Sequence, residues 1–189
     1  MIELRNNELV FKFPEVHPNA KLSIGFQRTL RLPDNGEMHY LPPGLGDFNV
    51  RHVDDFPVHN DWKKHGGVML PMYQSEAMWI NFNSTYPFAI KIAAGKINAV
   101  NGDPWVNTLN NQDYLVSPDQ PWLDGFYAGP GVIRQFVAMP LGQGHTAEEQ
   151  ITGNAEFGGL QIAAWPLLAS EYDEPMYSCN NYSMGINEC

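Results

Sequence analysis

Ala77-Met-Trp-Ile-Asn-Phe82 and Phe88-Ala-Ile-Lys-Ile-Ala-Ala94 are the two stretches that decide the fold. In the second stretch Phe88, Ile90 and Ile92 alternate with smaller or polar residues, so an extended chain gains one apolar side. Alternation with a period of two is typical of a β-strand with one buried face. These two stretches therefore predict neighbouring strands that share a core.

The same period extends through most of the chain. It begins at Leu9–Phe13 and runs through Leu22–Leu32, where a change of phase beside Gly25 suggests a β-bulge or bend. The chain also contains 17 Gly and 15 Pro, dispersed rather than clustered, which suits many short elements joined by turns. Further strands are expected at Lys96–Val100, Asp113–Ser117, Val132–Met139 and Leu160–Trp165.

Helical signals are few. Thr146-Ala-Glu-Glu149 matches a capping box, with Gly153 placed to end a helix of about two turns. Asn60–His65 is expected to form a single turn with Asn60 as its N-cap. We therefore predict an all-β fold with one short helix near 146–152, built as an antiparallel β-sandwich or a partly closed barrel. Residues 1–170 would form one β-rich domain, and residues 171–189 a loosely ordered, acidic and Asn-rich tail.

Charge and composition narrow the classes of partner and compartment. The 189 residues carry a formal net charge of −10, and no Lys or Arg follows Arg134. Such a chain offers no electrostatic footprint for nucleic acid or for an anionic membrane surface. The N-terminus lacks the features of a signal peptide, so we expect the cytoplasm. The only two cysteines, Cys179 and Cys189, make neither a disulfide framework nor a metal-site pair.

The first group of candidate functional residues lies between positions 52 and 65. His52, Asp54 and His59 are of the types that bind Zn, Mn or Fe, and His52 and Asp54 would share one face of a strand. Pro57 and two lysines interrupt the group, however, and solvated surface histidines are the more common outcome. No cofactor is indicated by any motif in the chain.

A second group combines aromatic, amide and carboxylate side chains. Such side chains suit a sugar, because a ring can stack on its C–H face while polar groups hold its hydroxyls. Two carboxylates, Glu76 and Asp124, could also act as the acid and base of a glycoside hydrolase. The alternative is that these residues belong to the core and tie down loops. The group comprises Tyr73, Gln74, Glu76, Trp79, Trp105, Trp122 and Asp124.

A third group is basic. If they face one side, these residues would form a patch for a carboxylate or phosphate. Lys91 and Lys96 flank an expected hairpin turn, and we favour the reading that they are charges that protect an edge strand from aggregation. The group comprises Lys91, Lys96, Asn98, Arg134 and Gln135.

Four segments resemble a family of uncharacterised microbial proteins of unknown function. They are LPMYQSEAMW at 70–79, KIAAGKINAV at 91–100, DYLVSPDQPWLDG at 113–125 and RQFVAMPLGQGHTAEEQITG at 134–153. The resemblance covers roughly residues 22–165. It implies no activity, cofactor or catalytic residue.

The sequence favours a non-enzymatic binding or assembly module, which would recognise a carbohydrate or another small polar ligand through the second group. A hydrolase that uses Glu76 and Asp124, or a metal near His52, is one alternative. A structural subunit of a homo-oligomer is the other, because a sandwich with open edges often associates.

Overall fold

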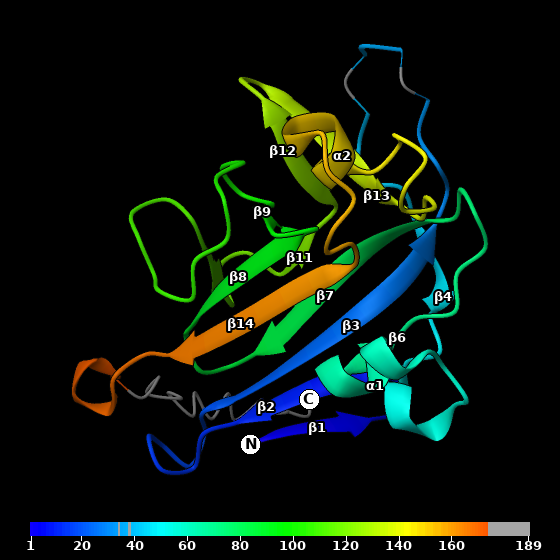
Figure 1. The fold of residues 1–189 in the computed structure, drawn as a ribbon. Coiled ribbons are helices and arrows are strands. Elements are labelled where there is room, and N and C mark those ends of the chain that lie inside the picture. Colours follow the sequence, from blue (N-terminus) through cyan, green and yellow to red (C-terminus); the bar gives the residue numbers. More distant parts are fainter. Residues whose placement is uncertain (34, 38, 174–189) are drawn as a thin grey trace, which may run out of the picture.

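The computed structural model describes residues 1–33, 35–37 and 39–173. The chain is built from antiparallel strands arranged in two main sheets, with two short α-helices outside them (Figure 1). Within the described residues the sheets do not close into a barrel. The predicted all-β, sandwich-like fold is confirmed.

The larger sheet is organised around one long strand pair. β3 (Lys21–Thr29) and β7 (Ala77–Ser84) pair without interruption, from Leu22 opposite Ser84 to Thr29 opposite Ala77. All other strands of this sheet extend outward from these two. In order they are β1 (Ile2–Arg5), β2 (Glu8–Lys12), β3, β7, β13 (Val132–Val137) and β12 (Gly125–Gly129), with β4 (Gly44–Asp47) paired to β3 and β11 (Trp122–Leu123) paired to β7.

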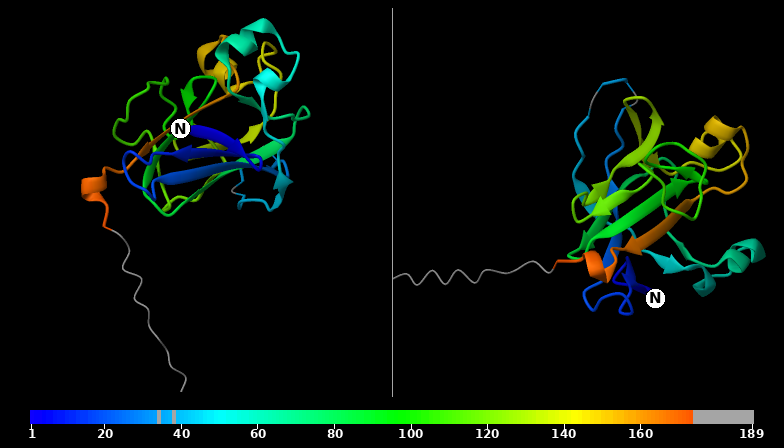
Figure 2. Two further views of the ribbon diagram at one scale, coloured as in Figure 1. Left: turned by 90° about the horizontal axis from the view of Figure 1, so that it is seen from below. Right: turned by 90° about the vertical axis from the view of Figure 1, so that its left-hand side faces the viewer.

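The smaller sheet is centred on β8 (Phe88–Ala94), which lies between β10 and β14. A tight turn after β8 leads into β9, which pairs back onto the end of β8. A separate two-stranded ladder of β5 and β6 accompanies the helix α1, and this segment lies at the periphery in both views of Figure 2. The bounds are β9 (Ile97–Asn98), β10 (Leu115–Ser117), β14 (Leu160–Pro166), β5 (Arg51–His52) and β6 (Val68–Met69).

The core lies between the two sheets and follows the period of two. Each of three strands contributes every second residue to it, all of them at most 5% exposed. The intervening residues of β3 and β7 face the other side of the large sheet, which positions Trp79 and Asn81 there. The core residues are Leu22, Ile24 and Phe26 from β3, Met78, Ile80 and Phe82 from β7, and Phe88, Ile90 and Ile92 from β8.

Of the bulge or bend predicted at Gly25, the bulge is wrong, because the pairing of β3 with β7 continues unbroken through this residue. Gly25 lies opposite Asn81, and a Cβ atom at this position would collide with the Asn81 amide. The glycine therefore permits a close approach between two strands rather than a change of phase.

The two α-helices lie where the sequence indicated helical turns. The capping box of Thr146 and Glu149 is present, and α2 (Ala147–Thr152) ends at Gly153 in the left-handed conformation. The other helix, α1 (Asn60–His65), is capped by His59 and not by Asn60, which is the first helical residue. His59 has extended backbone, and its ring accepts a hydrogen bond from the Asp61 N–H at 3.5 Å. Two 3₁₀ turns, Val53–Asp55 and Ala169–Glu171, complete the helical content of the described residues.

The beginning of the expected tail is packed against the sandwich. The Tyr172 ring lies 4.3 Å from the Tyr86 ring and 5.0 Å from the His17 ring, centroid to centroid. The rest of the predicted tail, from residue 174 onward and including Cys179 and Cys189, lies outside the described residues.

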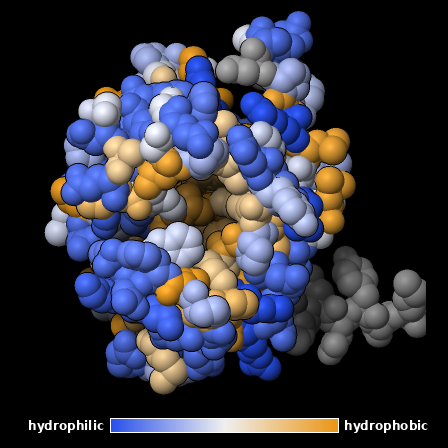
Figure 3. Space-filling view, turned by 45° about the vertical axis from the view of Figure 1, so that its right-hand side comes forward, coloured by the Kyte–Doolittle hydropathy of each residue, from blue (hydrophilic) through white to orange (hydrophobic). Residues whose placement is uncertain are grey.

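One side of the molecule is hollowed, and apolar residues line the hollow (Figure 3). The sandwich is incompletely covered along β14, where Leu160, Ile162 and Ala164 pack on the core yet remain only half-buried.

Among the described helices, none combines the length and the apolar character that a membrane span requires.

Gly125 gives a test of the sheet geometry, because a Cβ there would overlap the backbone carbonyl of Arg134 on the neighbouring strand. Gly125→Ala should lower the free energy of unfolding by about 1–3 kcal/mol, the usual effect of overpacking. Gly44→Ala is the matched control, because its Cβ would crowd only the movable end of the Gln27 side chain, at 2.9 Å, and would meet the Trp79 ring at an ordinary contact distance of 3.4 Å. The control should stay within about 0.5 kcal/mol in urea titrations. Equal losses in the two variants would contradict the described pairing of β12 with β13.

Candidate functional site

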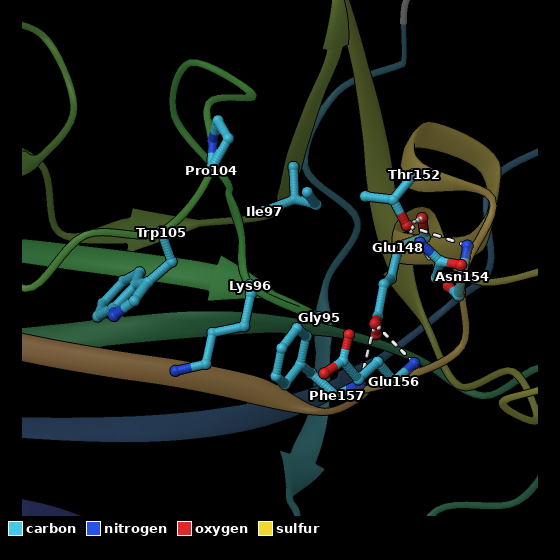
Figure 4. A pocket seen from close by; sticks show the side chains of 10 residues that line it. All are labelled: Gly95, Lys96, Ile97, Pro104, Trp105, Glu148, Thr152, Asn154, Glu156 and Phe157. Atoms are coloured by element: carbon cyan, nitrogen blue, oxygen red, sulfur yellow. Dashed lines mark hydrogen bonds between the residues drawn. The ribbon is translucent and has the colours of Figure 1, made fainter.

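A pocket of about 390 Å³ opens beside the turn that joins β8 to β9 (Figure 4). Three segments form its walls: residues 95–97 of the turn, residues 104–105 shortly after it, and, about 40 positions further along the chain, α2 with the loop that follows it. Each segment is fixed by hydrogen bonds to another, so the pocket is largely preformed.

The turn places Lys96 at the pocket in an unusual backbone conformation. Gly95 and Lys96 both have positive φ, 57° and 63°, as in a type I′ hairpin turn. A positive φ is uncommon for a residue with a side chain, so this conformation must be held by its surroundings. The Gly95 N–H donates to the Gly159 carbonyl at 2.9 Å, and the Lys96 N–H donates to Oε1 of Gln161 at 2.7 Å.

Trp105 is tied directly to the same turn. Its backbone N–H donates to the Lys96 carbonyl at 2.8 Å, and its indole N–H donates to Asn107 at 2.6 Å. The Lys96 ammonium lies 5.8 Å from the centroid of the indole ring, within the range of a cation–π interaction. Figure 4 shows the Lys96 side chain between the rings of Trp105 and Phe157.

The third wall is held by a buried carboxylate. Glu148 of α2 is 2% exposed, and its oxygens accept the backbone N–H groups of residues 156, 157 and 158 at 2.8, 2.8 and 2.6 Å. Gly95 makes room for it, since a Cβ on Gly95 would lie 2.6 Å from Oε2 of Glu148. Burial raises the pKa of Glu148, but the three N–H donors outweigh burial and leave the pKa below its ordinary value of 4.5.

The predicted basic patch is not assembled as one surface. Lys91 is 1% exposed, and its ammonium contacts Asp113 at 2.6 Å and the Thr108 carbonyl at 2.9 Å. Asn98 is also buried and donates to the backbone carbonyl of Asp113. β8 has a neighbour on both sides, so the interpretation that we favoured from the sequence, Lys91 as an edge-strand charge, is also wrong. The buried Lys91 ammonium needs an ionic partner, and Asp113 supplies it. Together with the hydrogen bond from Asn98, this ion pair fixes the 108–113 loop.

Arg134 and Gln135 lie on β13 in the other sheet. The Gln135 amide bridges to the backbone of the 30–32 segment, accepting from the Leu32 N–H and donating to the Leu30 carbonyl, each at 2.9 Å. Of the basic group, only Lys96 lines the pocket. There it meets Trp105, which the sequence had placed in the aromatic group.

Trp79 and Trp122 share the outer face of the large sheet. Trp122 of β11 lies opposite Asn81, and Trp79 precedes Asn81 by two residues on β7. Within the described part of the chain, the indole N–H of Trp79 and Oδ1 of Asn81 are buried without a hydrogen-bond partner. The two tryptophans thus lie on one face of the large sheet, and neither of them lines the pocket.

Glu76 serves a loop. Its two carboxylate oxygens accept from Arg28 Nε at 3.0 Å and from the Tyr73 N–H at 2.8 Å. Tyr73 and Gln74 are exposed in this loop. Asp124 lies beside β13, where its backbone carbonyl accepts from the Phe136 N–H. Nothing in the described contacts joins Glu76 to Asp124.

His52, Asp54 and His59 are exposed and do not gather. Among the described residues, no three His, Cys, Asp or Glu side chains lie close enough together to hold one metal ion. His59 instead contacts Asp61 at 3.3 Å on the surface of α1.

Sequence reasoning missed Glu148, Asn154, Glu156 and Phe157 as pocket residues. The capping box did locate the helix that carries Glu148, but nothing in the spacing indicated that its carboxylate would be buried. Comparison of the chain with protein-family models, with curated proteins and with solved structures finds no match.

Removing the Lys91 ammonium would leave the Asp113 carboxylate buried and unpaired. Lys91→Met, which keeps most of the side-chain volume, should therefore lower the free energy of unfolding by about 3–5 kcal/mol. Lys63→Met, on the exposed surface of α1, is the control and should change it by less than about 0.5 kcal/mol in urea titrations. A small loss for Lys91→Met would mean that the Lys91–Asp113 pair is not formed in solution.

Glu148 should make stability depend on pH in the acid range. Because its pKa is lowered on folding, its contribution is complete above its ordinary value of 4.5 and is lost as the pH falls through the folded pKa. Glu148→Gln should be less stable than the wild type at pH 7, and this difference should shrink below about pH 4.5. Thermal unfolding from pH 7 to pH 3 measures it, with the exposed Glu15→Gln as control. A difference that is constant across this range would contradict the role assigned to Glu148.

Proposed function

We propose that this chain is a non-enzymatic binding module that takes a small polar ligand into the pocket beside the β8–β9 turn. The observation that carries the proposal is that two aromatic residues, Trp105 and Phe157, and several polar residues line the same pocket. A volume of about 390 Å³ is at the low end for ligand sites. It suits a molecule of about the size of a monosaccharide, a small acid or an amino acid.

The side chains supply the two kinds of contact that such ligands need. The rings of Trp105 and Phe157 offer apolar surface to the C–H groups of a ligand, and Phe157 is 54% exposed. Asn154 and Lys96 line the same pocket, and their amide and ammonium groups could orient polar groups of the ligand. Glu148, the carboxylate in the wall, is engaged in holding the loop, which favours recognition over acid–base chemistry.

A ligand panel with matched tryptophan variants tests the proposal. Monosaccharides, small carboxylates and amino acids would be screened by thermal shift, and the best ligand then titrated by calorimetry. A ligand at 100 times its dissociation constant should add about 2.7 kcal/mol to the stability. Trp105→Ala and Phe157→Ala should each abolish the shift, whereas Trp122→Ala on the outer face should retain it.

Trp105→Ala alone could abolish binding by disturbing the fold, because Trp105 lies close to the buried Lys91. Phe157→Ala is the control for this effect, because the Phe157 side chain is exposed and its removal should leave the fold intact. Binding that survives Trp105→Ala and Phe157→Ala but is lost in Trp122→Ala would move the site to the outer face of the large sheet. A panel with no shift that depends on Trp105 or Phe157 would overturn the proposed function.

A further inference from the structure

Two opposite charges line the pocket without neutralising each other. Lys96 and Glu156 both contribute to its walls, yet no ion pair joins them anywhere in the described residues. Within residues 1–33, 35–37 and 39–173, the electrostatic contact of the Lys96 ammonium is the cation–π interaction with the Trp105 ring. Glu156 is fixed through its backbone N–H, which donates to Glu148, while its side chain extends toward the pocket (Figure 4).

The remaining charges around the pocket are already compensated. Glu148 accepts three backbone N–H groups, so its negative charge is stabilised where it stands. Lys91, whose ammonium lies 5.5 Å from the centroid of the Trp105 ring, is paired with Asp113 at 2.6 Å. Lys96 and Glu156 are therefore the two charged groups of this pocket that a ligand can still satisfy.

We propose that the ligand of this pocket is a zwitterion, which places its carboxylate on Lys96 and its ammonium on Glu156. The inference rests on the proposed binding function and names the ligand class. An ion of a single sign would gain one of these contacts and be repelled by the other. A ligand with both charges gains both, and opposite charges placed to match a partner are a main source of selectivity.

The charge of the whole chain supports the same choice. A net charge of −10 repels small anions at long range, which weakens the case for a simple carboxylate or phosphate as the ligand. A zwitterion has no net charge and avoids this repulsion. Lys96 and Glu156 are not in ion-pair contact, so a ligand that meets both presents its two charges at separate positions, and methylene groups between these charges would lie against the rings.

A matched set of probes tests the ligand class with the full chain. Calorimetry at pH 7 and low salt would compare 6-aminohexanoate with hexanoate, hexylamine and hexan-1-ol, which keep the spacer and remove one or both charges. Glycine would test the spacer itself. We expect 6-aminohexanoate to bind at least about tenfold more tightly than each of the others, because a contact to a charged group contributes about this much.

Two variants assign the charges. Lys96→Asn removes the ammonium with a residue that tolerates positive φ, and it should reduce the affinity for 6-aminohexanoate to that for hexylamine. Glu156→Gln should reduce the affinity for 6-aminohexanoate to that for hexanoate. Lys63→Asn and Asp54→Asn, which remove exposed charges outside the pocket, should change nothing.

The outcomes separate this inference from the proposed function. One outcome is that a sugar or hexanoate binds as tightly as 6-aminohexanoate in a way that depends on Trp105. This result would overturn the inference that the ligand is a zwitterion, but the pocket would remain the binding site. Binding of 6-aminohexanoate that is unaffected by Lys96→Asn and Glu156→Gln would also overturn it. If no probe and no member of the panel binds in a way that depends on Trp105 or Phe157, the proposed function and this inference fall together.

Discussion

The unbroken pairing of β3 with β7 is the constraint on which the rest of the structure depends. Because every residue from Leu22 to Thr29 has a partner on β7, the two strands share one phase, and a shift by one residue would turn the whole apolar set outward. All further strands of the large sheet attach to one or other member of this pair, or to a strand that does. The small sheet then covers the apolar face through Phe88, Ile90 and Ile92 of β8.

Buried polar residues of the small sheet hold a loop that is not part of any strand. The side chain of Lys91 on β8 forms an ion pair with Asp113, and the side chain of Asn98 on β9 donates a hydrogen bond to the backbone carbonyl of Asp113. Asp113 in turn accepts the backbone N–H of Asn110 at 3.0 Å. Burial raises the pKa of Asp113, but the contacts with Lys91 and Asn110 outweigh burial and leave the pKa below its ordinary value. The long segment between β9 and β10 is thus organised by side chains, in the manner of a fully satisfied buried network.

The sequence located most of the long strands and α2, but it missed β1, β4, β11 and β12, and it did not show which elements contact each other. Alternation of apolar residues located β2, β3, β7, β8, β13 and β14, and the Thr146–Glu149 capping box located α2, because both signals are local. Lys91 was misjudged because the strand alternation of β8 does not reveal which polar residue will meet a buried carboxylate 22 positions away. The pocket could not be found for a related reason: Gly95 indicates a turn, but its close contact with Glu148 joins segments more than 50 positions apart. Gly25 was read as a bulge because the sequence does not show the Asn81 side chain that crosses it.

The way Glu148 holds residues 156–158 has a consequence for how the pocket could change during evolution. The helix carboxylate binds only main-chain N–H groups, which every residue except proline provides. The side chains of residues 156 and 157 are therefore released from any part in keeping the loop in place, and both are exposed. Natural variation or protein engineering can replace these two side chains while the hydrogen bonds to Glu148 remain. One scaffold can therefore be adapted to different ligands with little loss of folding stability.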